Sequence, residues 1–138
     1  MIAYVDSSVI LRIVLQQPAA LPGLDMYEGL VTSTLTQLEC LRAVDNLRAA
    51  GGLDPDETTV RRHAVFAKLR GLVRVPVTGA VFARAEGGFP TPIATLDAIH
   101  LATALVWRER RAPDLSFVTH DRQQARAATA LGFDIVGV

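Results

Sequence analysis

The chain has 138 residues, of which 50% are hydrophobic and 20% are charged, and its 14 basic residues balance its 14 acidic residues. This length is enough for one domain with a buried core and too short for two, so we expect residues 1–138 to form a single domain. The composition excludes a disordered or collagen-like chain, and zero formal net charge gives no overall attraction to nucleic acid.

The apolar N-terminal residues do not have the pattern of a membrane span or a secretory leader. Polar residues interrupt the first fifteen positions at Asp6, Ser7, Ser8 and Arg12. Spans and leader segments need an uninterrupted apolar run. We therefore expect a cytoplasmic protein.

Short apolar runs alternate with helical patterns along the chain. The sequence predicts strands at residues 2–5, 30–32, 73–77, 115–119 and 134–138, and helices at 9–15, 34–50, 55–70, 79–86, 96–110 and 122–131, with a loop at 17–23 and a short helical piece near 24–27. Short apolar strands that alternate with helices imply a parallel sheet covered on both faces, which is a three-layer α/β/α sandwich.

Capping residues mark several of these helix starts. Asp54 precedes Pro55, with Glu57 three residues after the cap, and this pattern predicts a capping box. Thr34 and Gln37 have the same spacing. Thr78 and Thr95 are expected to cap the two helices that follow.

Four acidic residues share one expected place in the fold. Asp6 directly follows the first strand, Asp121 lies just beyond Thr119 at the end of a later strand, and Glu39 and Asp97 fall in the first turns of helices. In an open α/β sheet, ligands bind outside the carboxyl ends of the strands. We therefore expect the four carboxylates at one edge of the sheet.

Each aspartate taken alone is also explained as a helix cap or as an acid favoured by the helix dipole. Glu39 is harder to explain in this way, because it lies in an apolar helical sequence where an unpaired carboxylate is costly. Acids gathered together repel one another unless a cation compensates their charge. The candidate ligands are all oxygen atoms, and the sequence has no cysteines and histidines at the spacing of a zinc site. Such ligands favour Mg²⁺ or Mn²⁺ over zinc.

The cysteine and the three histidines do not form a zinc motif. Cys40 is the only cysteine and lies in an apolar pattern, which predicts a buried, inert thiol. His100 lies three residues after Asp97 on the same helix face, and a hydrogen-bonded structural role is favoured over metal ligation. His120, beside Asp121, is expected to be exposed.

Four segments carry a resemblance to a known family. They are residues 4–11 (YVDSSVIL), 33–39 (STLTQLE), 96–104 (LDAIHLATA) and 119–121 (THD). These segments resemble the four acidic motifs of PIN-domain ribonucleases, and within that family the VapC toxins of type II toxin-antitoxin systems. The similarity extends over almost the whole chain in order and spacing, and the segment around Asp97 is the most specific.

The resemblance implies a PIN-like α/β/α domain that binds Mg²⁺ or Mn²⁺ and hydrolyses RNA phosphodiester bonds with metal-activated water. By resemblance, the catalytic and metal-binding acids are Asp6 and Asp97 as principal ligands, Glu39 as a ligand direct or through water, and Asp121 as the fourth acid. Ser7 and Thr119 match hydroxyl positions beside the site, and Thr119 and Asp121 compete for the place nearest the metal.

The resemblance also implies an RNA substrate, an antitoxin protein that binds the toxin and blocks its site, and a homodimer. Apolar residues 11–15 and 24–41 could supply a groove for a partner helix, although core packing explains many of the same residues.

Two other interpretations remain open. A receiver-type Mg²⁺-binding domain also carries acids at strand ends, but it needs a lysine at a late strand end, and Lys68, the only lysine, lies in a predicted helix. A catalytically inactive PIN-like module that only binds a partner is not excluded by the sequence, although the full acidic set argues against it.

Overall fold

The computed structural model describes residues 1–21 and 23–138. Within these residues, five parallel strands form one sheet in the spatial order β3-β2-β1-β4-β5. The strands are β1 (Ile2–Val5), β2 (Gly29–Ser33), β3 (Val73–Val75), β4 (Ser116–Val118) and β5 (Ile135–Val136). The chain adds β2 and β3 on one side of β1 and then β4 and β5 on the other. The topological switch point therefore lies between β1 and β4, where open α/β sheets bind ligands.

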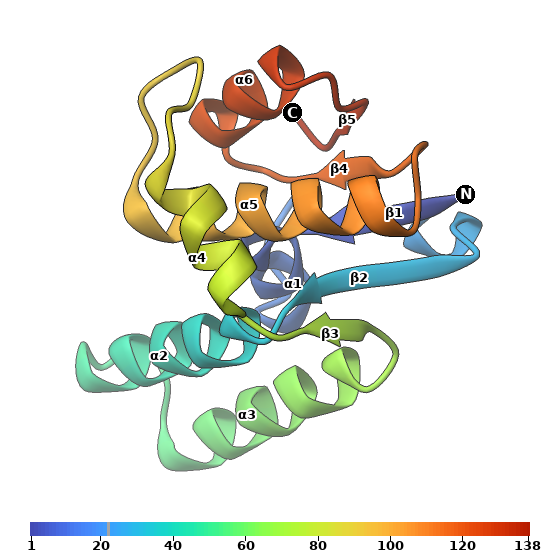
Figure 1. Cartoon of the computed structure of the whole chain (residues 1–138). Coiled ribbons are helices and arrows are strands. Elements are labelled where there is room, and N and C mark those ends of the chain that lie inside the picture. The colour runs from blue at the N-terminus through green and yellow to red at the C-terminus, as the bar shows by residue number, and fades with distance from the viewer. Residues whose placement is uncertain (22) are drawn as a thin grey trace.

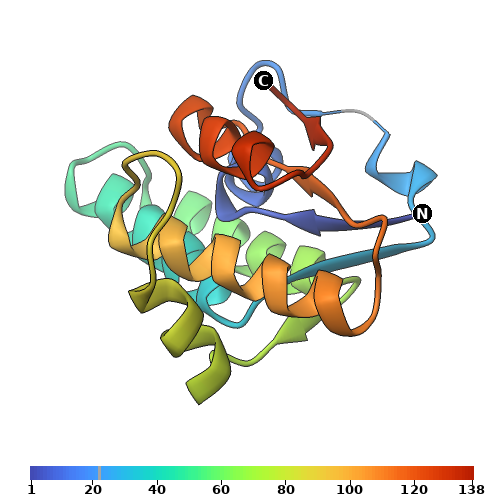
Figure 2. The same ribbon diagram turned by 45° about the horizontal axis from the view of Figure 1, so that its top comes forward.

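Helices cover both faces of this sheet. They are α1 (Ser7–Val14), α2 (Leu35–Ala49), α3 (Pro55–Leu69), α4 (Gly79–Glu86), α5 (Thr95–Arg110) and α6 (Arg122–Ala130), with a 3-10 turn η1 (Leu24–Met26) before β2. Figure 1 shows α5 in front of the strands and α1 behind them. The short helix α4 packs against α5 (Figure 2). The predicted three-layer α/β/α sandwich with a parallel sheet is confirmed.

The alternation of side chains along β1 divides the core in two. Ala3 and Val5 point into a cluster with buried residues of α1, α2 and α3. Tyr4 points to the opposite face, where α5, α6 and Phe117 of β4 form the second cluster. Because successive strand residues face opposite sides, the same strand anchors both layers and ends at Asp6.

Of the four predicted caps, those at Asp54 and Thr78 are confirmed and those at Thr34 and Thr95 are corrected. Helix α1 begins at Ser7, two residues before the predicted start. Asp54 and Glu57 form the predicted capping box. Thr34, however, has helical backbone angles and makes no side-chain cap bond; the Ser33 Oγ accepts instead from the Leu35 N–H at 3.1 Å. Thr95 is already inside α5, whose N-cap is Ala94.

Segment ends also differ from the sequence predictions. The last three strands are shorter than expected, because parallel hydrogen-bonded pairing covers only three residues each of β3 and β4 and two of β5. Pro22, part of the predicted loop at 17–23, lies outside the described residues. Among the helices that the structure describes, none is long and apolar enough to cross a membrane.

Two glycines with positive φ provide a matched test of this fold. Gly137 has φ +111°, and a Cβ there would overlap the carbonyl oxygen of Thr119, whereas Gly51 has φ +81° and open space around it. We expect Gly51→Ala to lower the free energy of unfolding by about 1 kcal/mol from backbone strain alone. Gly137→Ala should lower it by about 2–4 kcal/mol, because the overlap adds to the strain. Urea unfolding measures both; equal losses would contradict the collision at Thr119.

Candidate active site

The acids predicted from the sequence gather around the carboxyl ends of β1 and β4. Asp6 directly follows β1 and caps α1, and its backbone N–H donates to the carbonyl oxygen of Val118, the last residue of β4. Thr119 follows that residue on the neighbouring strand. The two strands therefore deliver Asp6 and Thr119 side by side at the switch point.

The two carboxylate oxygens of Asp6 have different surroundings. Oδ2 accepts hydrogen bonds from the Ser8 hydroxyl at 2.7 Å, the Ser8 backbone N–H at 3.3 Å and the Thr119 hydroxyl at 3.2 Å. Oδ1 is buried and has no hydrogen-bond partner among the described residues. A buried carboxylate oxygen without a hydrogen-bond partner is costly, and the only group close to Oδ1 among the described residues that can carry a positive charge is the His100 ring, whose Nε2 lies 3.6 Å away.

His100 lies between two of the acids. Its Nε2 is 2.5 Å from the Glu39 Oε1 and 3.6 Å from the Asp6 Oδ1, while its Nδ1 is 2.7 Å from the Tyr4 hydroxyl. Burial by itself lowers the pKa of His100, but the hydrogen bond to Glu39 and the charges of Asp6, Glu39 and Asp97 raise it above its usual value. A single buried imidazole thus links β1, α2 and α5.

Asp97 is the acid that is most affected by its neighbours. It lies in the first turn of α5 and is about half buried. Burial, followed by the charges of Asp121 and Asp6, raises the pKa of Asp97 from 3.8 to about 6, and only the charge of His100 opposes them. The Asp97 carboxylate is therefore destabilised in its ionised form, as expected where acids converge without a compensating cation.

Thr119 and Asp121 play different parts in this geometry. The Thr119 hydroxyl is buried and contacts Asp6, and it also lies 2.9 Å from the Gln124 Oε1. The Asp121 Oδ1 accepts from the backbone N–H groups of Gln123 and Gln124 and so caps α6. Of the two residues, Thr119 is the one bonded to Asp6, while Asp121 acts on the site through its charge.

The hydroxyl beside Asp6 belongs to Ser8, whereas the resemblance pointed to Ser7. Ser7 lines a shallow groove next to Glu39 instead. An N-cap side chain accepts from the N–H two or three residues later, so the identification of Asp6 as a cap was the signal that points to Ser8. Tyr4 was missed as part of the site because its sequence position is that of an ordinary core residue of β1.

The remaining histidine and the cysteine give one correction and one confirmation. His120 is only partly exposed, because its backbone N–H donates to the Ser8 hydroxyl and its Nδ1 lies 2.9 Å from the Gly137 carbonyl oxygen. The prediction of an exposed side chain was wrong. Cys40 is buried as predicted, and burial, with the nearby charges of Glu39 and Asp6, raises the pKa of its thiol to about 12. A thiol with such a pKa is not a nucleophile at neutral pH.

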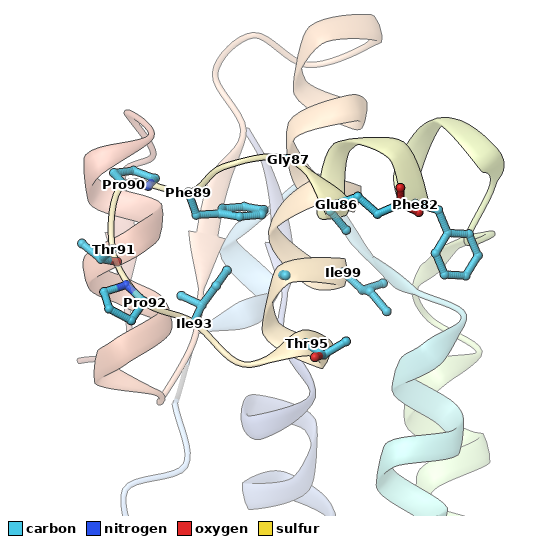
Figure 3. Close-up of a pocket in the computed structure, with 12 residues that line it drawn as sticks. Phe82, Glu86, Gly87, Phe89, Pro90, Thr91, Pro92, Ile93, Thr95 and Ile99 are labelled. Carbon is cyan, nitrogen blue, oxygen red and sulfur yellow. The ribbon is translucent and has the colours of Figure 1, made fainter.

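Two hollows flank the acids. A groove between α1 and α2 is lined by Leu11, Leu35, Leu38, Glu39 and Leu96 among others, and Leu38 and Leu96 are exposed. A larger pocket lies between the end of α4, the loop at 87–93 and the first turns of α5 (Figure 3). The side chains that line this pocket are mostly apolar, and none of the four acids is among them.

The donors fit a hard divalent cation better than they fit zinc. The groups that meet at the switch point are carboxylate and hydroxyl oxygens, and the imidazole of His100 is occupied at both nitrogens. Among the described residues, no three Asp, Glu, His or Cys side chains are close enough together to form a ready-made metal cage. Mg²⁺ is commonly held by one or two carboxylates while it keeps several waters. The open Asp6 Oδ1, with Asp97 nearby, suits that kind of binding.

A family model described as "PIN domain" matches residues 3–130, and the chain therefore belongs to the PIN domain family. It is 33% identical over 138 residues to Ribonuclease VapC46 of Mycobacterium tuberculosis, covering 96% of this chain and 95% of that protein. It is 32% identical over 140 residues to Ribonuclease VapC47 of the same species, covering 94% of this chain and 92% of that protein. Within the PIN domain family, the chain thus stands with the VapC ribonucleases.

Solved structures share the fold at low sequence identity. A toxin-antitoxin complex from Klebsiella pneumoniae aligns with a TM-score of 0.67 and 14% identity, covering 97% of this chain and 95% of that chain. VapBC2 from Rickettsia felis, bound to a DNA fragment from its promoter, aligns with a TM-score of 0.66 and 11% identity, covering 99% of this chain and 98% of that chain. VapBC-5 from Mycobacterium tuberculosis aligns with a TM-score of 0.61 and 18% identity, covering 99% of this chain and 98% of that chain.

The raised pKa of Asp97 predicts a pH-dependent stability in metal-free protein. The folded state holds the Asp97 proton up to about pH 6, whereas the unfolded chain releases it near 3.8. The folded state therefore binds more protons in this window, and its free energy of unfolding falls as the pH rises through it. We expect Asp97→Asn to remove roughly 1 kcal/mol of this fall, after allowing for solvent screening at a half-exposed group.

The measurement is urea unfolding in EDTA between about pH 4 and pH 7.5. Asp56→Asn, at an exposed position in the first turn of α3, is the matched control. If the free energy of unfolding changed with pH in the same way for the wild type and for Asp97→Asn, the electrostatic description of the site would be contradicted.

Proposed function

We propose that this protein is a Mg²⁺- or Mn²⁺-dependent endoribonuclease that acts as the toxin of a type II toxin-antitoxin pair. The observation that carries this proposal is the buried Asp6 Oδ1, which lies at the switch point of the sheet without a hydrogen-bond partner among the described residues. Membership of the PIN domain family and the names of the curated relatives support the ribonuclease activity.

In this proposal Asp6 and Asp97 would hold the cation, and Glu39 would contact it directly or through water. When bound, Mg²⁺ lowers the pKa of a water and neutralises charge on the phosphate. The Ser8 and Thr119 hydroxyls bind the Asp6 Oδ2, so that Oδ1 would be free to bind the cation. Asp121 contributes negative charge from the start of α6. No protein nucleophile is required, which agrees with the inert thiol of Cys40.

The proposed partners are an RNA substrate, an antitoxin protein and a second copy of the chain. The structural neighbours include complexes of toxins with antitoxins. The groove between α1 and α2 supports an antitoxin helix as occupant, because exposed Leu38 and Leu96 lie on it beside Glu39. An apolar helix face fits such a groove, and a partner seated there would cover the approach to the acids.

Cleavage of RNA by the purified protein tests the proposed activity. We expect cleavage with Mg²⁺ or Mn²⁺ and none with EDTA. Asp6→Asn and Asp97→Asn should each lose at least about 100-fold in rate, because each removes a charged ligand. Both variants should stay folded, with thermal stability in EDTA equal to or above that of the wild type, since one repelling charge is gone.

Asp56→Asn is again the matched control, because it removes one exposed carboxylate from the first turn of α3 that is not among the four predicted acids. It should cleave RNA like the wild type. RNA binding by the wild type without cleavage under any of these cations would instead favour an inactive binding module.

A further inference from the structure

The acids at the switch point do not by themselves attract an RNA strand. Their negative charge repels its phosphates, and the chain has no net charge that would draw RNA in from a distance. Basic side chains close to the acids must supply the attraction. The only lysine, Lys68, lies near the end of α3. The candidates are therefore the arginines of the helices that follow or carry the acids, which are α1, α2, α5 and α6.

The arginines of the first three of these helices are already in use or lie at the wrong end. On α2, the Arg42 Nη1 donates to the Asp45 carboxylate at 2.9 Å. On α1, the Arg12 Nη1 lies 3.3 Å from the His120 Nδ1. The arginines of α5 are in its last turn, whereas Asp97 is in its first. The arginines of α6 remain.

Arg122 and Arg126 of α6 are free to bind a ligand. Both side chains are exposed, and neither forms an ion pair or a side-chain hydrogen bond within the part of the chain that the structure describes. Four residues apart, they share one helix face and lie about 6 Å apart along the helix axis. Arg122 directly follows Asp121, whose charge acts on Asp97. The pair therefore starts beside the acids and extends one turn away from them.

A groove between α6 and β5 contains both side chains. It has a volume of about 590 Å³, which is in the range of ligand sites, and Ala125 and Ile135 line it together with the two arginines. Figures 1 and 2 show α6 beside β5, the strand at this edge of the sheet. We call this hollow the arginine groove. Its two positive charges are spread along its length, over an apolar surface.

The lining of the arginine groove fits a phosphate backbone better than it fits bases. Guanidinium groups bind phosphate oxygens through paired N–H donors. Among the described lining residues there is no aromatic ring to stack on a base and no amide or acidic side chain to read a base edge. The Thr129 hydroxyl already donates to the Ala125 carbonyl oxygen at 2.9 Å. The groove therefore offers charge without sequence readout.

We propose that the arginine groove binds the phosphates of the RNA strand next to the bond that is cleaved, with Arg122 and Arg126 as the contacts. The inference deepens the proposed nuclease function and rests on it. A strand with one phosphate at the acids carries its neighbouring phosphates past the start of α6, where Arg122 comes first and Arg126 one turn later. Binding energy from these phosphates holds the strand in place and is the same for every sequence.

The first test is the binding of a fluorescent single-stranded RNA in EDTA over a series of KCl concentrations. We expect Arg122→Gln/Arg126→Gln to weaken binding about 10-fold at low salt. The slope of log affinity against log KCl should become shallower by about 1.4, because each lost phosphate contact removes about 0.7 for a single strand. RNAs of different sequence should lose affinity equally. Arg122→Lys/Arg126→Lys should keep most of the slope, since both charges stay.

The matched control is Arg62→Gln/Arg70→Gln, which removes two exposed arginines from α3 and from the residue that follows it. Helix α3 packs in the first core cluster and α6 in the second, on opposite faces of the sheet. We expect this control to keep the affinity and salt slope of the wild type. All variants should unfold thermally like the wild type, because the four side chains are exposed.

The second test is RNA cleavage with Mg²⁺. In Arg122→Gln/Arg126→Gln the loss should fall on KM, which rises about 10-fold, and not on kcat, because the phosphate contacts are made equally before and during the reaction. A fall in kcat at constant KM would overturn the proposal.

Equal affinities and salt slopes for the two double Arg→Gln variants would also overturn the proposal, and so would a wild type that binds no RNA at low salt. If the wild type binds RNA but cleaves none with any cation, the proposed nuclease function fails instead. The binding series needs no metal and no cleavage, so a shallower slope in Arg122→Gln/Arg126→Gln would still support the arginine groove as an RNA site in that case.

Discussion

Repulsion among carboxylates at one edge of the sheet is the constraint on which the rest of the site depends. Asp97 shows its effect, because burial together with the charges of Asp121 and Asp6 raises its pKa to about 6. Hydrogen-bond donors compensate part of this repulsion: the hydroxyls of Ser8 and Thr119 bind Asp6, and His100 binds Glu39. The hydroxyls of Ser8 and Thr119 satisfy single oxygens and bring no charge, and His100, whose pKa is raised by these carboxylates, brings at most one positive charge. A divalent cation would bring two.

The parallel topology is what concentrates the acids. Because the chain reverses its direction of growth between β1 and β4, the residues after both strands meet, and Asp6 and Thr119 come together although they are far apart in sequence. Helix α5 then presents Asp97 and His100 one turn apart on the same face. The fold therefore places an acid and a compensating donor together where its elements reach the switch point.

The sequence was sufficient for the layers, for the parallel sheet and for the common location of the acids, since each depends on local periodicity and on strand ends. It was insufficient where partners are distant. His100 contacts Tyr4 and Glu39, so that three different elements meet at its ring, and no local pattern distinguishes such a histidine from one packed in an ordinary core. The hydrogen bond from Ser8 to Asp6 is a different case, because the cap geometry that produces it can be inferred from the sequence.

The asymmetry of Asp6 links the stability of the fold to its chemistry. Oδ2 accepts from the hydroxyl and the backbone N–H of Ser8 in α1 and from the Thr119 hydroxyl after β4, and the bond from Thr119 joins the ends of the two central strands. Oδ1 lies in the same buried place without a partner among the residues that the structure describes. Rigid bonding of one oxygen thus fixes the direction of the other, and the part of the carboxylate that stabilises the fold is separate from the part left for a ligand. In the proposed function, a cation at Oδ1 would supply the missing partner of this buried oxygen and would leave the bond between Asp6 and Thr119 intact.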